Sequence, residues 1–171
     1  RSEEQKQLDE EEKLKELERL KKIKELEKSL EDAMRDGFKY AQWQARYEFV
    51  TPDIVIDGGH NKDGIRVLKE SLKAEKRPIT LVITMMRDKD YEECISDIIS
   101  VAGNVIATEL DMPRALKADE IKKICDNSGV NCLAIPDVGD AIAEAMTKDS
   151  LICICGSLYL AGEAKRILEN K

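Results

Sequence analysis

The sequence predicts an α/β fold, a six-stranded and mostly parallel sheet flanked by helices and preceded by one long charged helix. Two observations carry this prediction. From residue 46 onward, short apolar runs rich in β-branched residues alternate with longer segments of helical periodicity, which is typical of a parallel sheet with right-handed crossovers. Before that, residues 1–36 contain neither glycine nor proline and consist largely of Glu, Lys and Leu, which predicts one uninterrupted helix.

The first helix is expected to end at Gly37, the position that glycine commonly takes after a helix. Its apolar residues recur in steps of three from Leu14 to Leu26, so their row turns by about 60° per step around the helix. Such a row is a poor seam for a long dimeric coiled coil, which alternates steps of three and four. The composition resembles an engineered or linker helix. We expect the part from Leu20 onward to pack on the domain or on a second copy, with residues 1–13 exposed.

Two domains are expected, a helix over residues 1–36 and an α/β domain over residues 37–171, with an aromatic-rich connector at residues 38–44. The expected strands are 46–50, 54–57, 79–85, 104–109, 131–135 and 151–155. The expected helices of the domain are 63–75, 91–102, 118–128, 138–147 and 158–169. The first two strands are predicted to be antiparallel neighbours, and five of the six strands are predicted to be parallel.

The most informative stretch is residues 53–64. An apolar run ends at Asp57, and Gly58 and Gly59 then let the backbone turn sharply and approach a ligand. His60, the one histidine of the chain, and Asn61 follow before the next helix begins. Ligands of open α/β sheets sit where strands end and helices begin, so this stretch predicts a phosphate or carboxylate site. The alternative is plain turn chemistry with a solvated histidine, since the stretch is not a phosphate loop.

Composition narrows the function classes. The net charge is −7 and only 4% of residues are aromatic, which argues against a nucleic-acid surface. No apolar run is long enough to span a bilayer, and no signal-peptide core is present at the start. The five cysteines are odd in number, lack a CxxC pair and lie in apolar patterns, so we expect buried thiols, no metal site and a cytoplasmic location.

Five short motifs at strand ends bring in a family resemblance. In order they are Trp43-Gln-Ala-Arg46-Tyr-Glu48, Asp57-Gly-Gly-His-Asn61, Asp88-Lys-Asp90, Met112-Pro-Arg-Ala115 and Gly156-Ser-Leu-Tyr159. Together they resemble the C-terminal domain of the folylpolyglutamate synthase/dihydrofolate synthase family, within the Mur ligase superfamily. The resemblance covers about residues 29–171 and implies a Rossmann-like sheet.

The resemblance also implies an activity and a set of roles. Enzymes of this family are ATP-dependent amide ligases that join glutamate to a folate through an acyl phosphate. By resemblance, Arg46, Asp57 and Lys89 would contact the nucleotide, and His60 and Ser157 would bind glutamate. Gly58, Gly59, Asn61 and Gly156 would support the turns around them. For Lys89 a solvated loop lysine is an equal alternative to a phosphate contact, and for Arg114 a structural role, as a cap or in a pair, is preferred.

The chain departs from the family pattern in two ways. The usual WPGR is Trp43-Gln-Ala-Arg46 here. In place of the usual DGAHNP the chain has Gly59 for the alanine and Lys62 for the proline. More importantly, no GxxxxGK[ST] phosphate loop occurs in the sequence. We therefore expect the family's N-terminal ATPase domain to be a missing partner that supplies magnesium, with ATP as the nucleotide and no tightly bound cofactor. No catalytic residue is expected in this chain alone, which should be inactive by itself.

Three functions follow from this. The first is the glutamate- and nucleotide-contacting domain of a ligase. The second is a helix-fused scaffold or oligomerisation module, in which the long helix forms a homo-oligomer. The third, a standalone nucleotide-binding regulator, is disfavoured because this domain type does not carry the main phosphate grip. No partner of the nucleic-acid or membrane class is expected.

Overall fold

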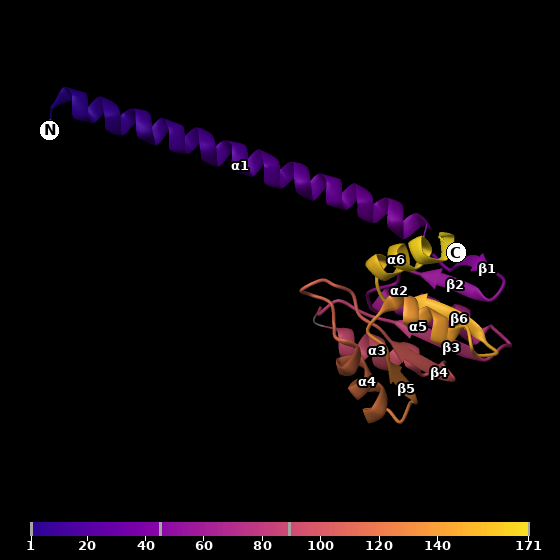
Figure 1. Cartoon of the computed structure of the whole chain (residues 1–171). Coiled ribbons are helices and arrows are strands. Elements are labelled where there is room, and N and C mark those ends of the chain that lie inside the picture. Colours follow the sequence, from indigo (N-terminus) through magenta and orange to yellow (C-terminus); the bar gives the residue numbers. More distant parts are fainter. Residues whose placement is uncertain (1, 45, 89, 171) are drawn as a thin grey trace. The chain divides into compact units, whose positions relative to one another are not determined.

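The computed structural model describes residues 2–44, 46–88 and 90–170, and for residues 33–44 it describes the course of the backbone without the side chains. The chain forms two compact units, residues 1–40 and residues 41–171. Within the described residues, one long helix and a six-stranded α/β domain are present, as predicted (Figure 1).

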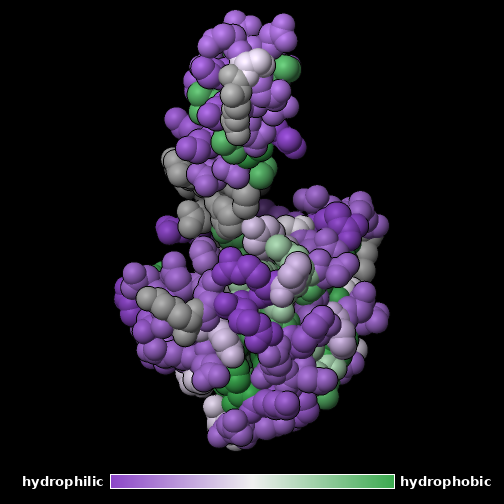
Figure 2. Space-filling model, turned by 90° about the vertical axis from the view of Figure 1, so that its left-hand side faces the viewer, coloured by the Kyte–Doolittle hydropathy of each residue, from purple (hydrophilic) through white to green (hydrophobic). Residues whose placement is uncertain are grey.

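The long helix α1 spans Glu3–Gln44, so the predicted end at Gly37 and the predicted connector at residues 38–44 are wrong. A glycine inside a helix costs only about 1 kcal/mol relative to alanine, and no proline follows it before Pro52. The side chains of Leu17, Leu20 and Leu26 are 50%, 49% and 71% exposed. The face of the molecule in Figure 2 is largely hydrophilic, and hydrophobic residues form small separate patches on it.

The sheet has the strand order β1-β2-β6-β3-β4-β5. Strand β1 pairs antiparallel with β2, and the other neighbours pair parallel, which confirms five parallel strands out of six. The observed strands are β1 Glu48–Thr51, β2 Ile54–Asp57, β3 Ile79–Ile83, β4 Asn104–Ala107, β5 Cys132–Ala134 and β6 Leu151–Cys155. Several bounds differ from the predicted ones by one or two residues; β3 and β4 stop at Ile83 and Ala107, and the residues that follow them, Thr84 and Thr108, are still buried.

Helices cover both faces of the sheet. Their bounds are α2 Lys62–Lys73, α3 Tyr91–Ile99, α4 Ala118–Asn127, α5 Val138–Ala145 and α6 Leu158–Glu169. One core cluster joins the sheet to α2, α3 and α4, and a second joins it to α5 and α6 (Figure 1). The central strands β3 and β6 are buried along their whole length, as expected of strands covered on both faces.

At β6 the connecting helices diverge to opposite faces of the sheet. The helices that follow β2 and β3 lie on one face of the sheet, whereas α6, which follows β6, lies on the other. Ligands of open α/β sheets bind at such a divergence, outside the carboxyl ends of the strands. The residues after Asp57 and after Cys155 therefore stand at the edge where a site is expected.

Candidate functional site

The predicted site residues converge at the carboxyl ends of β2 and β6. Asp57 is the register partner of Cys155, so Gly58 and Gly156 leave the sheet side by side. Gly156 has a φ of 104°, a conformation that favours glycine. His60 and Ser157, which follow these glycines by two residues and one residue, therefore come from the same edge of the sheet.

Asp57 ties two backbone segments together. Its Oδ1 accepts a hydrogen bond from the N–H of Gly59 at 2.7 Å, and its Oδ2 accepts one from the N–H of Tyr47 at 3.0 Å. Burial raises the pKa of Asp57, and these two N–H donors and the charge of Arg46 oppose that rise. Its carboxylate is therefore a half-buried acceptor that holds the turn.

His60 and Asn61 begin α2. Nδ1 of His60 lies 3.1 Å from the carbonyl oxygen of Gly58, and a carbonyl oxygen only accepts, so this contact is a hydrogen bond when Nδ1 carries the hydrogen. Nε2 of a neutral His60 is then an acceptor. The side-chain oxygen of Asn61 accepts from the N–H of Gly64 at 2.8 Å and caps the helix. Its role as a supporting turn residue has a direct physical basis.

Ser157 caps α6 and is 1% exposed. Its Oγ accepts from the N–H of Tyr159 at 3.1 Å and from the N–H of Leu160 at 3.4 Å. The hydroxyl therefore points into the first turn of the helix. Ser157 therefore lies next to the predicted site, but its Oγ is used as an acceptor in the helix cap.

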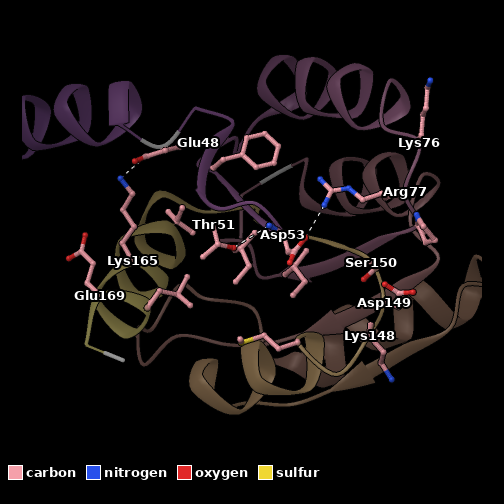
Figure 3. A pocket seen from close by; sticks show the side chains of 17 residues that line it. Glu48, Thr51, Asp53, Lys76, Arg77, Lys148, Asp149, Ser150, Lys165 and Glu169 are labelled. Atoms are coloured by element: carbon pink, nitrogen blue, oxygen red, sulfur yellow. Dashed lines mark hydrogen bonds and ion pairs between the residues drawn. The ribbon is translucent and has the colours of Figure 1, made fainter.

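Two of the cavities lie at opposite ends of the parallel strands. The larger of these two, of about 940 Å³, lies at the end where the strands begin, away from the predicted site. Figure 3 shows two ion pairs among the residues that line it, Glu48 with Lys165 and Asp53 with Arg77. Within each pair the two charges neutralise each other.

The smaller cavity, of about 310 Å³, gathers the predicted site residues. Its lining comes from the segment before β1, the turn after β2, the start of α2 and Leu158, and it includes Arg46, Tyr47, Asp57, Gly58, Gly59, His60 and Asn61. We take this cavity as the candidate site, because a cation, a carboxylate, an imidazole and a helix N-terminus meet there.

The remaining motif residues connect the loop after β3 to the loop after β4. A β-bridge joins Met86 to Ala115, Arg114 pairs with Asp88 at 2.6 Å, and Arg87 pairs with Glu120 at 2.7 Å. The preferred structural role of Arg114 agrees with this geometry. Lys89 lies outside the described residues.

Two residues in or next to the candidate site were not predicted from the sequence. Tyr47 lines the cavity through a backbone conformation that no sequence pattern reveals. Lys62 stands where the family has proline, and it pairs with Glu93 at 2.8 Å and with Asp90 at 3.6 Å. The sequence does contain a signal for this pairing, because Lys62 begins one helix and acidic residues begin the next.

The cysteines form no site of their own. All five are free and buried, and Cys153 and Cys155 belong to the same core cluster, as predicted for two small hydrophobes on one strand face. Among the described residues, no group of three or more His, Cys, Asp or Glu side chains is arranged to hold a metal ion. None of the helices in that part of the chain is long and apolar enough to cross a membrane.

Comparisons with known proteins show which family the chain resembles in sequence and fold. Residues 41–167 match the family model of the dihydrofolate synthetase C-terminal domain. The chain is 29% identical over 145 residues to the dihydrofolate synthase/folylpolyglutamate synthase of Bacillus subtilis, covering 81% of this chain and 34% of that protein. It is 33% identical over 145 residues to the folylpolyglutamate synthase of Lacticaseibacillus casei, covering 79% of this chain and 32% of that protein.

The fold agrees as well. The structure of E. coli FolC in complex with DHPP and ADP superposes with a TM-score of 0.65 at 22% identity, covering 74% of this chain and 31% of that one. The matched region thus spans about a third of the length of the B. subtilis and L. casei relatives. Because the family match extends over the sheet and every described residue of the site, the chain belongs to the dihydrofolate synthetase C-terminal domain family.

Proposed function

We propose that residues 41–171 are the nucleotide- and glutamate-contacting domain of an ATP-dependent amide ligase of the folylpolyglutamate synthase/dihydrofolate synthase type. The observation that carries the proposal is the cavity in which Arg46, Asp57 and His60 meet at the end of β2. Its residues fit part of a nucleotide, because a cationic fork and a helix N-terminus both favour phosphate oxygens.

On the nucleotide side, Arg46 is exposed at the cavity and can donate to phosphate oxygens. Each carboxylate oxygen of Asp57 accepts one backbone N–H and retains further acceptor capacity, which suits a ligand hydroxyl. Lys89 remains the proposed second phosphate contact. Magnesium and the phosphate grip are assigned to the family's ATPase domain.

On the glutamate side, we assign Nε2 of His60 to the amino group of the incoming amino acid. Nδ1 is turned toward Gly58, which leaves Nε2 as the acceptor. Ser157 accepts two N–H groups of α6 and keeps its hydroxyl hydrogen for donation to a carboxylate. Its buried position means that it acts chiefly by fixing the N-terminus of α6 beside the cavity.

We further propose that this chain performs no ligation by itself. Phosphoryl transfer depends on aligning the phosphates and neutralising their charge with a metal ion, and the sequence contains no phosphate loop for that purpose. Folate-dependent ATP hydrolysis and glutamate ligation should both stay at background. Product above background that is abolished by Asp57→Ala would overturn this part of the proposal.

Calorimetric titration of the full chain tests the binding roles. Arg46→Gln should weaken ADP binding, and His60→Ala should weaken L-glutamate binding, each by about tenfold. Lys76→Gln, which removes a cation at the other cavity, is the matched control and should leave both affinities unchanged. Equal losses in all three variants would show nonspecific charge effects and contradict the site.

A second role, assembly through α1, is favoured by a separate observation. Leucines 14, 17, 20, 26 and 30 are each at least 49% exposed on this helix, and exposed apolar side chains on a helix commonly mark an interaction surface. We propose that α1 joins copies of the chain through the segment from Leu14 to Leu26.

A further inference from the structure

Tyr47 has a backbone conformation that its side chain disfavours. Its φ is 43°, and among the described residues no other non-glycine residue has a positive φ. This left-handed conformation costs an ordinary residue roughly 1–2 kcal/mol, so the surrounding structure must hold it. Such strain clusters at ligand-binding positions, and Tyr47 lines the candidate site.

Contacts on three sides hold Tyr47 in place. Its N–H donates to Oδ2 of Asp57 at 3.0 Å, and its hydroxyl donates to Oε1 of Glu75 at 3.2 Å. Its ring packs edge-on against Phe49, with centroids 5.6 Å apart, and against the core cluster on the α2 face of the sheet. Burial and the neighbouring Glu75 carboxylate raise the pKa of Tyr47 to about 12, so its hydroxyl remains a donor at neutral pH.

The residue fixed by these contacts directly precedes β1 and directly follows Arg46. Arg46 and Asp57 line the same cavity, and the positive charge of Arg46 opposes the rise in the pKa of Asp57 that burial causes. A left-handed residue turns the chain sharply. The backbone conformation of Tyr47 therefore sets the direction of Arg46 relative to β1.

We propose that Tyr47 is a positioning residue, whose anchored left-handed backbone holds Arg46 in the cavity where a nucleotide phosphate would bind. The phosphate part of this statement rests on the proposed function. The positioning of Arg46 at the cavity that Asp57 lines does not rest on it, because this part concerns only residues of this chain. Tyr47 is thus more than a core residue that supports the start of β1.

A thermodynamic cycle on the full chain tests the positioning without any ligand. The pKa of Asp57 is followed by carboxyl ¹³C NMR in the parent chain, Arg46→Gln, Tyr47→Gly and the double variant. Arg46→Gln should raise the pKa of Asp57 measurably, because a positive charge that favours the carboxylate is lost. In the Tyr47→Gly background, the same replacement should change it little, since Arg46 is already released.

Three results would overturn the proposal. One is an equal effect of Arg46→Gln in both backgrounds, and another is no effect in the parent chain. If Tyr47→Gly does not fold, the cycle is run with Tyr47→Phe, which removes only the bond to Glu75. That variant should shrink the effect of Arg46→Gln, and an undiminished effect is the third contrary result.

An ADP titration separates this proposal from the proposed function. Tyr47→Gly should weaken ADP binding by the same factor as Arg46→Gln, and the double variant should lose no more. If the parent chain does not bind ADP while the NMR cycle shows coupling, the nucleotide role fails and the positioning role stands. If ADP binds but the cycle is additive, the positioning role fails alone.

Discussion

Gly156 lies so close to Thr84 that a Cβ atom on residue 156 would overlap the carbonyl oxygen of Thr84. The two residues follow the neighbouring parallel strands β6 and β3. Their close approach lets the chain turn from β6 into α6 directly beside the candidate site, and it makes the turn intolerant of any side chain.

Replacing Gly156 with alanine should therefore be severely destabilising. We expect a loss of about 3 kcal/mol or more in the free energy of unfolding, because the backbone clash adds to the cost of a φ of 104°. Urea denaturation measures it. Gly162→Ala is the control, since a Cβ there meets nothing within 4 Å and helix propensity should stabilise the chain by up to about 1 kcal/mol. Similar losses in both variants would contradict the clash.

Asp57→Asn should also destabilise the domain. The amide has one acceptor oxygen and turns an N–H₂ donor toward either the N–H of Gly59 or that of Tyr47. A half-buried N–H without an acceptor costs about 1–3 kcal/mol. Asp149→Asn, at an exposed loop residue, should change stability by less than about 0.5 kcal/mol. The idea fails if the two variants unfold at the same urea concentration.

Glu120 should contribute stability that depends on pH. Hydrogen bonds from Arg87 and from the N–H of Lys117 lower the pKa of Glu120 to about 2. The folded chain therefore binds this proton less readily than the unfolded chain, so the contribution is complete above the ordinary glutamate pKa and is lost as the pH falls toward 2.

A series of urea denaturations between pH 2 and pH 7 checks this. Glu120→Gln should be less stable than the parent chain at neutral pH, and the difference should shrink on acidification. Both partners are exposed, so the effect should be modest. Glu92→Gln, another glutamate in the first turn of a helix, controls for helix-end charge. A difference that grows at low pH would have the wrong sign.

The double variant Leu17→Glu, Leu20→Glu in α1 should lower the mass of the chain in solution. If the exposed leucines join copies of the chain, a charged carboxylate at their centre cannot be buried. Light scattering measures the mass, and circular dichroism checks that the α/β domain stays folded. Met146→Glu alters an equally exposed residue of that domain and should leave the mass unchanged. A parent chain that is already monomeric would remove the assembly role.

Much of the architecture is local enough to be determined by the sequence. The β-branched runs, the helical periodicity and the Asp-Gly-Gly turn predicted each strand and helix of the domain, and the motifs at strand ends predicted the family. Helix α1 shows where local rules fail. Gly37 matches the pattern of a helix end, but one glycine costs too little to stop the helix, which continues to Gln44.

Only the tertiary structure decided how the site is built. The order β2-β6-β3 places Asp57 beside Cys155, although the two are far apart in the sequence, because backbone hydrogen bonds between strands ignore sequence distance. The same folding uses Oγ of Ser157 as a helix cap and joins Asp57 to Tyr47. The sequence by itself determined which chemical groups reach the sheet edge. The packing of the chain determined which atoms remain available there, since most buried polar groups are used in hydrogen bonds within the protein.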